Sequence, residues 1–132
     1  MIEKTLMIRG EHLEKILRGS KTWEVRSRPT NLRGRIALSE KGAARIVGSC
    51  TLRRVVGPLS IDRVLRNARR MGTSRKEVAE DLAHWKSECR DKRVYAWELG
   101  DARRFRKPVP FKNPSGAVTW ATLPPRIAAR LR

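Results

Sequence analysis

Lysine, threonine, glutamate and arginine side chains crowd into residues 19–26, which read GSKTWEVR. Lys21 can hold an anionic oxygen, Arg26 can bind a phosphate bidentately, and Glu24 can accept a hydrogen bond from a base amine. For catalysis, Glu24 could act as a general base towards water or a 2′-hydroxyl while Lys21 stabilises the developing anion. The competing structural interpretation is an ion pair of Glu24 with Lys21 or Arg26, and these residues alone favour neither.

The chain as a whole is strongly basic, with 31 lysine and arginine residues against 13 aspartate and glutamate residues and a net charge of +18. Such an excess favours nucleic acid, because phosphate contacts release counterions. One alternative is that the arginines are ordinary solvent-exposed residues. Another is that the chain is a regulatory module whose basic surface binds an acidic protein partner. We expect RNA as the partner, or else DNA or a nucleotide. Arg66, Arg69 and Arg70, at helical spacing, are the best candidates for a track along the phosphate backbone.

Several classes of protein are not favoured by the composition. No apolar run reaches the length of a membrane span, and the N-terminus lacks the apolar stretch of a signal peptide, so we expect a cytoplasmic protein with no membrane partner. Cys50 and Cys89 show no metal or redox spacing and are expected to be buried or incidental thiols. His12 and His84 are expected to be surface imidazoles, so we predict no metal and no cofactor. The sequence indicates no oligomeric state.

The apolar pattern predicts the elements that position the crowded segment. A strand at residues 5–8 precedes a helix over 11–18 that Gly19 ends, and in the next strand Thr22, Glu24 and Arg26 share one face. Helices are predicted to begin at the capping residues Ser60 and Ser74. Further strands are predicted at residues 34–38, 44–56, 94–99, 109–111 and 117–121. The fold class is therefore α+β, with a mixed or barrel-like sheet.

Tyr95 and Trp97 share a face of the strand predicted over 94–99. They could stack a base, although filling the core is the more frequent role of such side chains. Residues 1–123 are expected to form one domain, and residues 124–132 a basic C-terminal tail that is helical or frayed.

The order of these motifs resembles the ASCH family, a branch of the PUA-like superfamily. Residues 19–26 are similar to its G-x-K-x-x-E-x-R signature, and TNLRG at 30–34 is similar to its T-N-x-R-G turn. The strands at 48–52, 95–97 and 116–120 resemble its G-x-x-x-L, Y-A-W and G-x-x-x-W strands. The resemblance runs from Leu6 to about Leu123. It implies a small PUA-like β-barrel of about six strands, with three short helices flanking a cleft.

The resemblance implies an RNA-binding domain with a cationic cleft for a nucleotide or an RNA end. Some members are enzymes, so it also offers a ribonuclease or a hydrolase similar to the N4-acetylcytidine amidohydrolases. A Lys, a Thr and a Glu act in that hydrolase group, which makes Lys21, Thr22 and Glu24 the candidate catalytic residues. The candidate nucleic-acid-binding residues are Arg26, Arg28, Asn31, Arg33, Arg66, Arg69, Arg70, Tyr95 and Trp97.

Two segments depart from the family pattern. In the amidohydrolase group the nucleophilic threonine falls at the position of Glu24, which leaves Thr22, two residues upstream, as the nearest hydroxyl. Residues 9–12 read RGEH where many relatives have a Q-P-aromatic turn, so an aromatic side chain that would line the cleft is missing.

Overall fold

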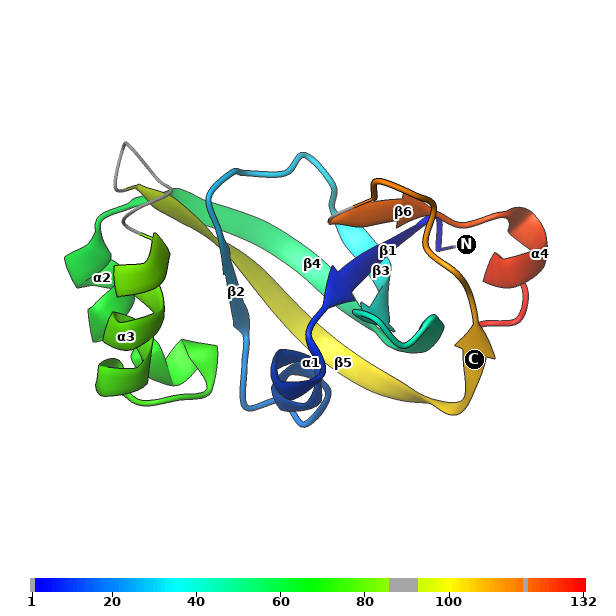
Figure 1. Ribbon diagram of the computed structural model, residues 1–132, viewed down its shortest axis with the longest axis horizontal. Helices are drawn as coiled ribbons and strands as arrows, with labels where there is room; N and C mark the ends of the chain where they lie inside the picture. Colours follow the sequence, from blue (N-terminus) through cyan, green and yellow to red (C-terminus); the bar gives the residue numbers. More distant parts are fainter. Residues whose placement is uncertain (1, 86–92, 118) are drawn as a thin grey trace.

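A computed structural model describes residues 2–85, 93–117 and 119–132 of the chain (Figure 1). These residues form one mixed sheet of six strands in the order β2-β5-β4-β3-β1-β6. The strands are β1 (Lys4–Ile8), β2 (Trp23–Arg26), β3 (Gly34–Glu40), β4 (Arg45–Leu59), β5 (Val94–Pro110) and β6 (Trp120–Thr122). The helices are α1 (Gly10–Leu17), α2 (Ile61–Arg66), the 3-10 turn η1 (Ala68–Met71), α3 (Arg75–Trp85) and α4 (Pro125–Ala128).

The sheet curls around a core but stays open, so the mixed sheet that the sequence predicts is confirmed and the β-barrel that the family resemblance implies is not. Trp97 on β5 stacks on Trp120 on β6, with ring centroids 5.6 Å apart, although three strands separate β5 from β6 in the sheet. Among the described residues, β2 pairs only with β5. Its other edge faces β1, and there a side chain makes the link: Arg26 Nη2 donates to the Met7 carbonyl oxygen at 3.3 Å.

The late part of the chain differs from the predicted strands. Residues 94–99 and 109–110, which lie in segments predicted as two strands, belong to one strand, β5, which pairs with β4 through several register shifts and ends before Phe111. The strand predicted over 117–121 is observed as β6, and Val118 lies outside the described residues. Residues 124–132 include α4, and Ile127 packs in a cluster with Phe105 and Val109. The described chain therefore has four α-helices, one more than predicted.

The predicted helix caps are confirmed. The helix that begins at residue 61 ends at Arg66, before the helical spacing predicted for Arg66, Arg69 and Arg70 is complete. The Ser60 and Ser74 side chains accept hydrogen bonds from the backbone N–H groups of Arg63 and Glu77. The chain leaves helical geometry at Asn67 (φ −108°, ψ 23°) and continues as η1. The helical spacing expected for Arg66, Arg69 and Arg70 is therefore wrong, because Arg66 ends α2 and the other two lie on η1.

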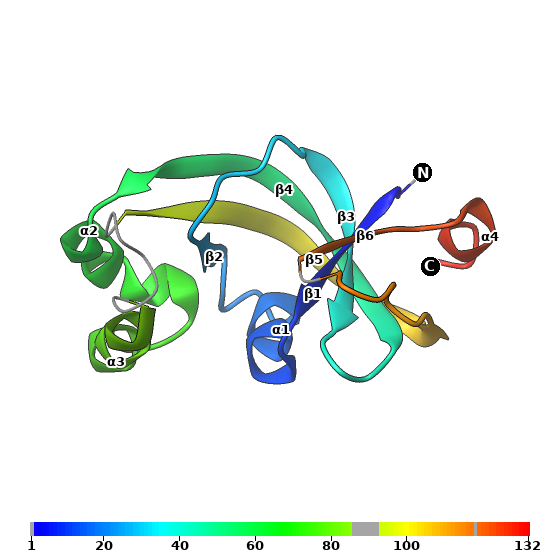
Figure 2. The same ribbon diagram turned by 45° about the horizontal axis from the view of Figure 1, so that its top comes forward.

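Two apolar clusters place β2 between α1 and α3 (Figure 2). Inside the curled sheet, Leu13 and Ile16 of α1 pack with the buried face that carries Trp97. On the other face, Trp23 of β2 packs with α2 and α3. Because Trp23 lies in the second cluster and Arg26 lies over Trp97 of the first, the polar residues of the β2 segment come to lie between two helices.

Cys50 is buried in the first cluster, as the sequence analysis expects of a structural thiol, and burial raises its pKa to about 12. Cys89 lies outside the described residues. In the part of the chain that the structure describes, no helix combines the length and apolar character that a membrane crossing requires.

Gly48 permits the close approach of α1 and β5 to β4, so its replacement tests this packing. A Cβ atom there would lie 2.5 Å from the Arg103 carbonyl oxygen and 2.7 Å from Cδ2 of Leu17. We expect Gly48→Ala to lower the free energy of unfolding by about 1–3 kcal/mol in urea denaturation. Gly10→Ala is the control, because its nearest atom is an ordinary 3.7 Å away. Equal denaturation midpoints for both variants and the parent would contradict this packing.

Candidate functional site

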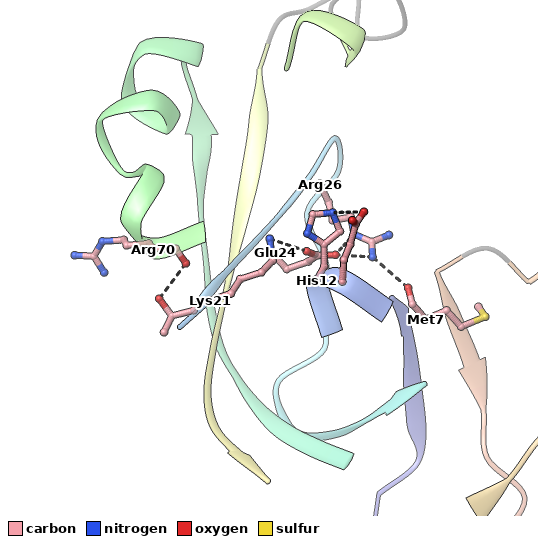
Figure 3. A network of polar contacts seen from close by, with 8 residues as sticks. Met7, His12, Lys21, Glu24, Arg26 and Arg70 are labelled. Carbon is pink, nitrogen blue, oxygen red and sulfur yellow. Dashed lines mark hydrogen bonds and ion pairs between the residues drawn. The ribbon is translucent and has the colours of Figure 1, made fainter. Parts of the chain in front are cut away.

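The Glu24 carboxylate lies between two cations at the end of β2 (Figure 3). Its Oε1 atom is 3.4 Å from Lys21 Nζ, and its Oε2 atom accepts from Arg26 Nη2 at 2.8 Å and Nε at 3.1 Å. Lys21 is 4% exposed and Glu24 is 7% exposed. Lys21 and Glu24 are therefore held largely out of bulk water, and the Arg26 side chain beside them is 24% exposed, so the buried pair depends on mutual compensation.

The turn after α1 fixes where Lys21 points. Gly19 adopts φ 80°, a left-handed conformation that glycine reaches without strain. The backbone N–H groups of Ser20 and Lys21 then both donate to the Lys15 carbonyl, which closes the helix end. Thr22 next donates its N–H to the Arg70 carbonyl at 2.7 Å and accepts from the Leu99 N–H at 2.7 Å. These contacts hold the segment rigidly between α1, η1 and β5.

Arg26 joins Glu24 to the core and to strand β1. Its guanidinium carbon lies 5.6 Å from the Trp97 ring centroid, and Nη2 also reaches the Met7 carbonyl. Trp97 is 3% exposed and donates its Nε1–H to the Arg28 carbonyl. Trp97 thus fills the core and supports Arg26 from below, rather than offering a ring face to a base.

A cleft of about 750 Å³ opens over this trio, between α1 and β1 on one side and α3 on the other. The chain's positive charge is not concentrated in it, because acidic and basic side chains are equally numerous in its lining. The acidic side chains of α3, Glu77, Glu80 and Asp81, form one wall. Glu11 and Glu24 add to them, and the basic lining residues are Arg9, Lys15, Lys21, Arg26 and Lys41.

His12 lines the same cleft from α1 with its side chain 34% exposed, and it was not among the candidate site residues. Burial first, and then the positive charge of Lys21, lower the pKa of His12 below its usual 6.5. The carboxylates of Glu24 and Glu11 act in the opposite direction without outweighing these effects. The imidazole is therefore neutral at pH 7 and can accept a hydrogen bond or a proton.

The structure brings together only some of the predicted site residues. Lys21, Glu24 and Arg26 meet at the floor of the cleft, whereas Thr22 lines a second, smaller hollow and directs its hydroxyl at the Arg70 carbonyl. Tyr95 is half-buried against the core. The remaining candidates are exposed outside the cleft: Arg28, Asn31 and Arg33 on the loop before β3, and Arg66, Arg69 and Arg70 on α2 and η1.

Sequence reasoning missed the acidic wall and His12 for different reasons. Glu77, Glu80 and Asp81 lie some fifty residues after the motif. No local sequence pattern predicts that α3 packs close to the motif in the folded chain. The position of His12 could have been predicted from the sequence. It stands three residues before Lys15 on the helix that leads into the motif, so the two side chains lie on the same face of that helix. Among the described residues, no group of three His, Cys, Asp or Glu side chains is placed to hold a metal ion.

Comparison with known proteins gives one family and one set of similar structures. The model of the ASCH domain family matches residues 6–109. The crystal structure of the ASCH protein from Zymomonas mobilis has a TM-score of 0.69 at 17% identity, covering 96% of this chain and 90% of that one. A mutant of that protein gives a TM-score of 0.70 at 17% identity, over 96% and 92% of the two chains. Comparison with curated proteins found no significant match.

The ion pairs of Glu24 predict that one single replacement lowers the free energy of unfolding more than a double replacement that removes both charges. We expect Glu24→Ala to lower the free energy of unfolding by about 3 kcal/mol, because it leaves Lys21 buried without compensation. The double variant Lys21→Met/Glu24→Gln removes both charges and keeps an acceptor for Arg26, so it should cost much less. Urea denaturation measures both. A Glu24→Ala protein as stable as the parent would show that these charges are solvated.

The lowered pKa of His12 predicts a pH-dependent contribution to stability. The folded state resists protonation of His12, so this contribution is complete above about pH 6.5 and declines as the pH falls below that value. We expect the parent to lose more stability between pH 7.5 and 5.5 than His12→Gln does, as measured by urea denaturation at both pH values. Equal losses of unfolding free energy in the parent and in His12→Gln would contradict the lowered pKa of His12.

Proposed function

The chain belongs to the ASCH domain family, and we propose that it is an RNA-binding domain whose cleft takes the base and sugar of one nucleotide or RNA end. The observation that carries the proposal is the buried pair of Lys21 and Glu24, joined by the partly exposed Arg26, at the floor of the cleft. A cleft of about 750 Å³ has the size of sites that bind small ligands.

The trio costs more than a purely structural role requires. An apolar pair of similar volume would join β2 to its neighbours at least as stably, because burying ions is expensive. The trio also keeps unused hydrogen-bonding capacity. The Lys21 ammonium carries three donors and meets Glu24 Oε1 at 3.4 Å, and Oε1 keeps a lone pair free, whereas Oε2 already accepts two hydrogen bonds from Arg26. These groups suit a ligand that presents both donors and acceptors, as a nucleobase does.

The charge pattern of the walls supports a base and sugar inside the cleft and phosphates outside it. Glu77, Glu80 and Asp81 on α3 would repel a phosphate chain that ran past them. Exposed arginines lie on the neighbouring surface, including Arg66 and Arg69 on α2 and η1. Phosphate contacts there would supply affinity without reading sequence, and one nucleotide in the cleft would supply selectivity.

A ribonuclease is the second candidate function, and His12 is the observation that favours it. Its neutral imidazole lines the cleft beside Lys21, so it could take a proton from a 2′-hydroxyl while Lys21 stabilises the phosphate that reacts. Glu24 is less suited to the role of base, because both of its oxygens already face a cation. The amidohydrolase alternative is weaker, since Thr22 is not among the residues that line the cleft.

We expect the parent to bind short single-stranded RNA with an affinity that falls steeply with salt, because of its phosphate contacts. Lys21→Met/Glu24→Gln should lower the affinity at least tenfold and leave the salt dependence unchanged, because it removes base contacts only. Fluorescence anisotropy with labelled RNA measures both quantities.

The control is Arg104→Met/Glu14→Gln, which removes an exposed ion pair outside the cleft and likewise leaves the net charge unchanged. This control should bind as the parent does. The proposal fails if the parent shows no RNA binding at low salt, or if both double variants bind as the parent does. Cleavage of the same RNA by the parent, and its loss in His12→Gln, would favour the ribonuclease.

A further inference from the structure

A second hollow, of about 350 Å³, lies on the other side of the Lys21 segment from the cleft. It is bounded by the end of α1, by Thr22, and by the paired strands β4 and β5, and two arginines, Arg53 and Arg70, line it. In Figure 3 the Arg70 side chain points away from the cluster around Glu24. Lys21 lines both hollows, so it is the wall that they share.

The two acidic residues of this hollow are already neutralised by arginines that do not line it. Glu98 is paired with Arg54 through its Oε2 atom. Asp101 is paired with Arg35 at 3.3 Å and with Arg103 at 3.5 Å. The remaining cations of the hollow therefore have no local acid to balance them.

Arg53 and Arg70 are those unbalanced cations. Within the described residues, neither makes a salt bridge to a carboxylate. Lys21, by contrast, is occupied with Glu24 on the cleft side. An anion that entered the hollow would meet two guanidinium groups and no unpaired carboxylate of the lining.

Arg53 and Arg70 are both exposed, and each guanidinium lies against one neighbouring residue. The Arg70 guanidinium carbon lies 5.4 Å from the centroid of the Trp23 ring, and Trp23 is itself buried. The Arg53 guanidinium lies across Gly100, where a Cβ atom would come within 2.5 Å of Nε and Cζ. Gly100 therefore leaves the space that Arg53 occupies. Guanidinium groups match the geometry of phosphate oxygens.

We propose that Arg53 and Arg70 form a phosphate subsite in this hollow, which takes a backbone phosphate of the RNA that the cleft binds. The Lys21 segment lies between the two hollows, so this phosphate belongs to a nucleotide other than the one in the cleft. The subsite rests on the proposed function only for the source of the phosphate, since inorganic phosphate presents the same oxygens. A test must therefore separate the subsite from RNA binding as a whole.

The first arm follows the arginine Nε–H signals of Arg53 and Arg70 by NMR during titration with inorganic phosphate and, separately, with a short single-stranded RNA. We expect both ligands to shift both signals in the parent. A lower midpoint concentration for the RNA identifies the RNA backbone as the source, and an equal or lower one for inorganic phosphate identifies the free anion. If neither ligand shifts these signals, the subsite does not exist.

The second arm measures RNA affinity against salt for Arg53→Gln/Arg70→Gln. Two lost phosphate contacts on a single strand should reduce the slope of log K against log salt by about 1.4. The control Arg63→Gln/Arg130→Gln removes the same charge from two exposed arginines outside the hollow and should change the slope less. Equal changes in the two double variants would overturn the subsite and leave the proposed function standing.

Gly100→Ala tests the geometry without changing the charge, because the added methyl group displaces the Arg53 guanidinium and meets no backbone atom as closely. We expect it to reduce the phosphate-induced shift of the Arg53 signal and to weaken RNA binding several-fold at an unchanged net charge. Parent-like phosphate shifts and RNA affinity in a folded Gly100→Ala protein would show that the placement of Arg53 does not matter and would overturn the subsite.

Discussion

The Glu24 carboxylate, held between Lys21 and Arg26, is the interaction on which the rest of this structure depends. The sheet curls but does not close, and at the open edge between β2 and β1 a side chain of this trio makes the crossing to the Met7 carbonyl. Because an arginine rather than a backbone ladder joins the two strands there, the edge stays open as a cleft. The residues of these ion pairs then line the floor of that cleft.

The cleft and the rest of the surface differ in charge, and we propose that they bind different parts of an RNA. The chain carries a net charge of +18, yet the cleft is lined by acids and bases in equal number. A polyanion is attracted to the molecule but finds no excess of cations inside the cleft. In the proposed function the acidic wall of α3 disfavours phosphate in the cleft, while Arg53 and Arg70 lie without local acids in the hollow behind Lys21. The base and the phosphates of an RNA would in this way be bound at two chemically different places.

The sequence predicted what local chemistry determines and missed what distant pairing determines. The cap residues Ser60 and Ser74, and the turn at Gly19, were predictable because each acts within a few residues. The second half of β5 was not, because residues 100–108 are mostly charged and are held as a strand by pairing with β4. The contact between Lys21, Glu24 and Arg26 was predictable because the three residues are close in sequence. The acidic wall and the open sheet were not, because they depend on where α3 and β1 pack.

The most direct test of the central claim is a two-dimensional amide NMR titration of the protein with the four nucleoside 5′-monophosphates. The account predicts that at least one of them shifts the amide signals of His12, Val25 and Met71 together, since these residues line the cleft from α1, β2 and η1. Their half-saturation concentrations should agree with one another. Shifts confined to exposed arginines, with these three signals unmoved for all four nucleotides, would contradict the claim that the cleft takes a nucleotide.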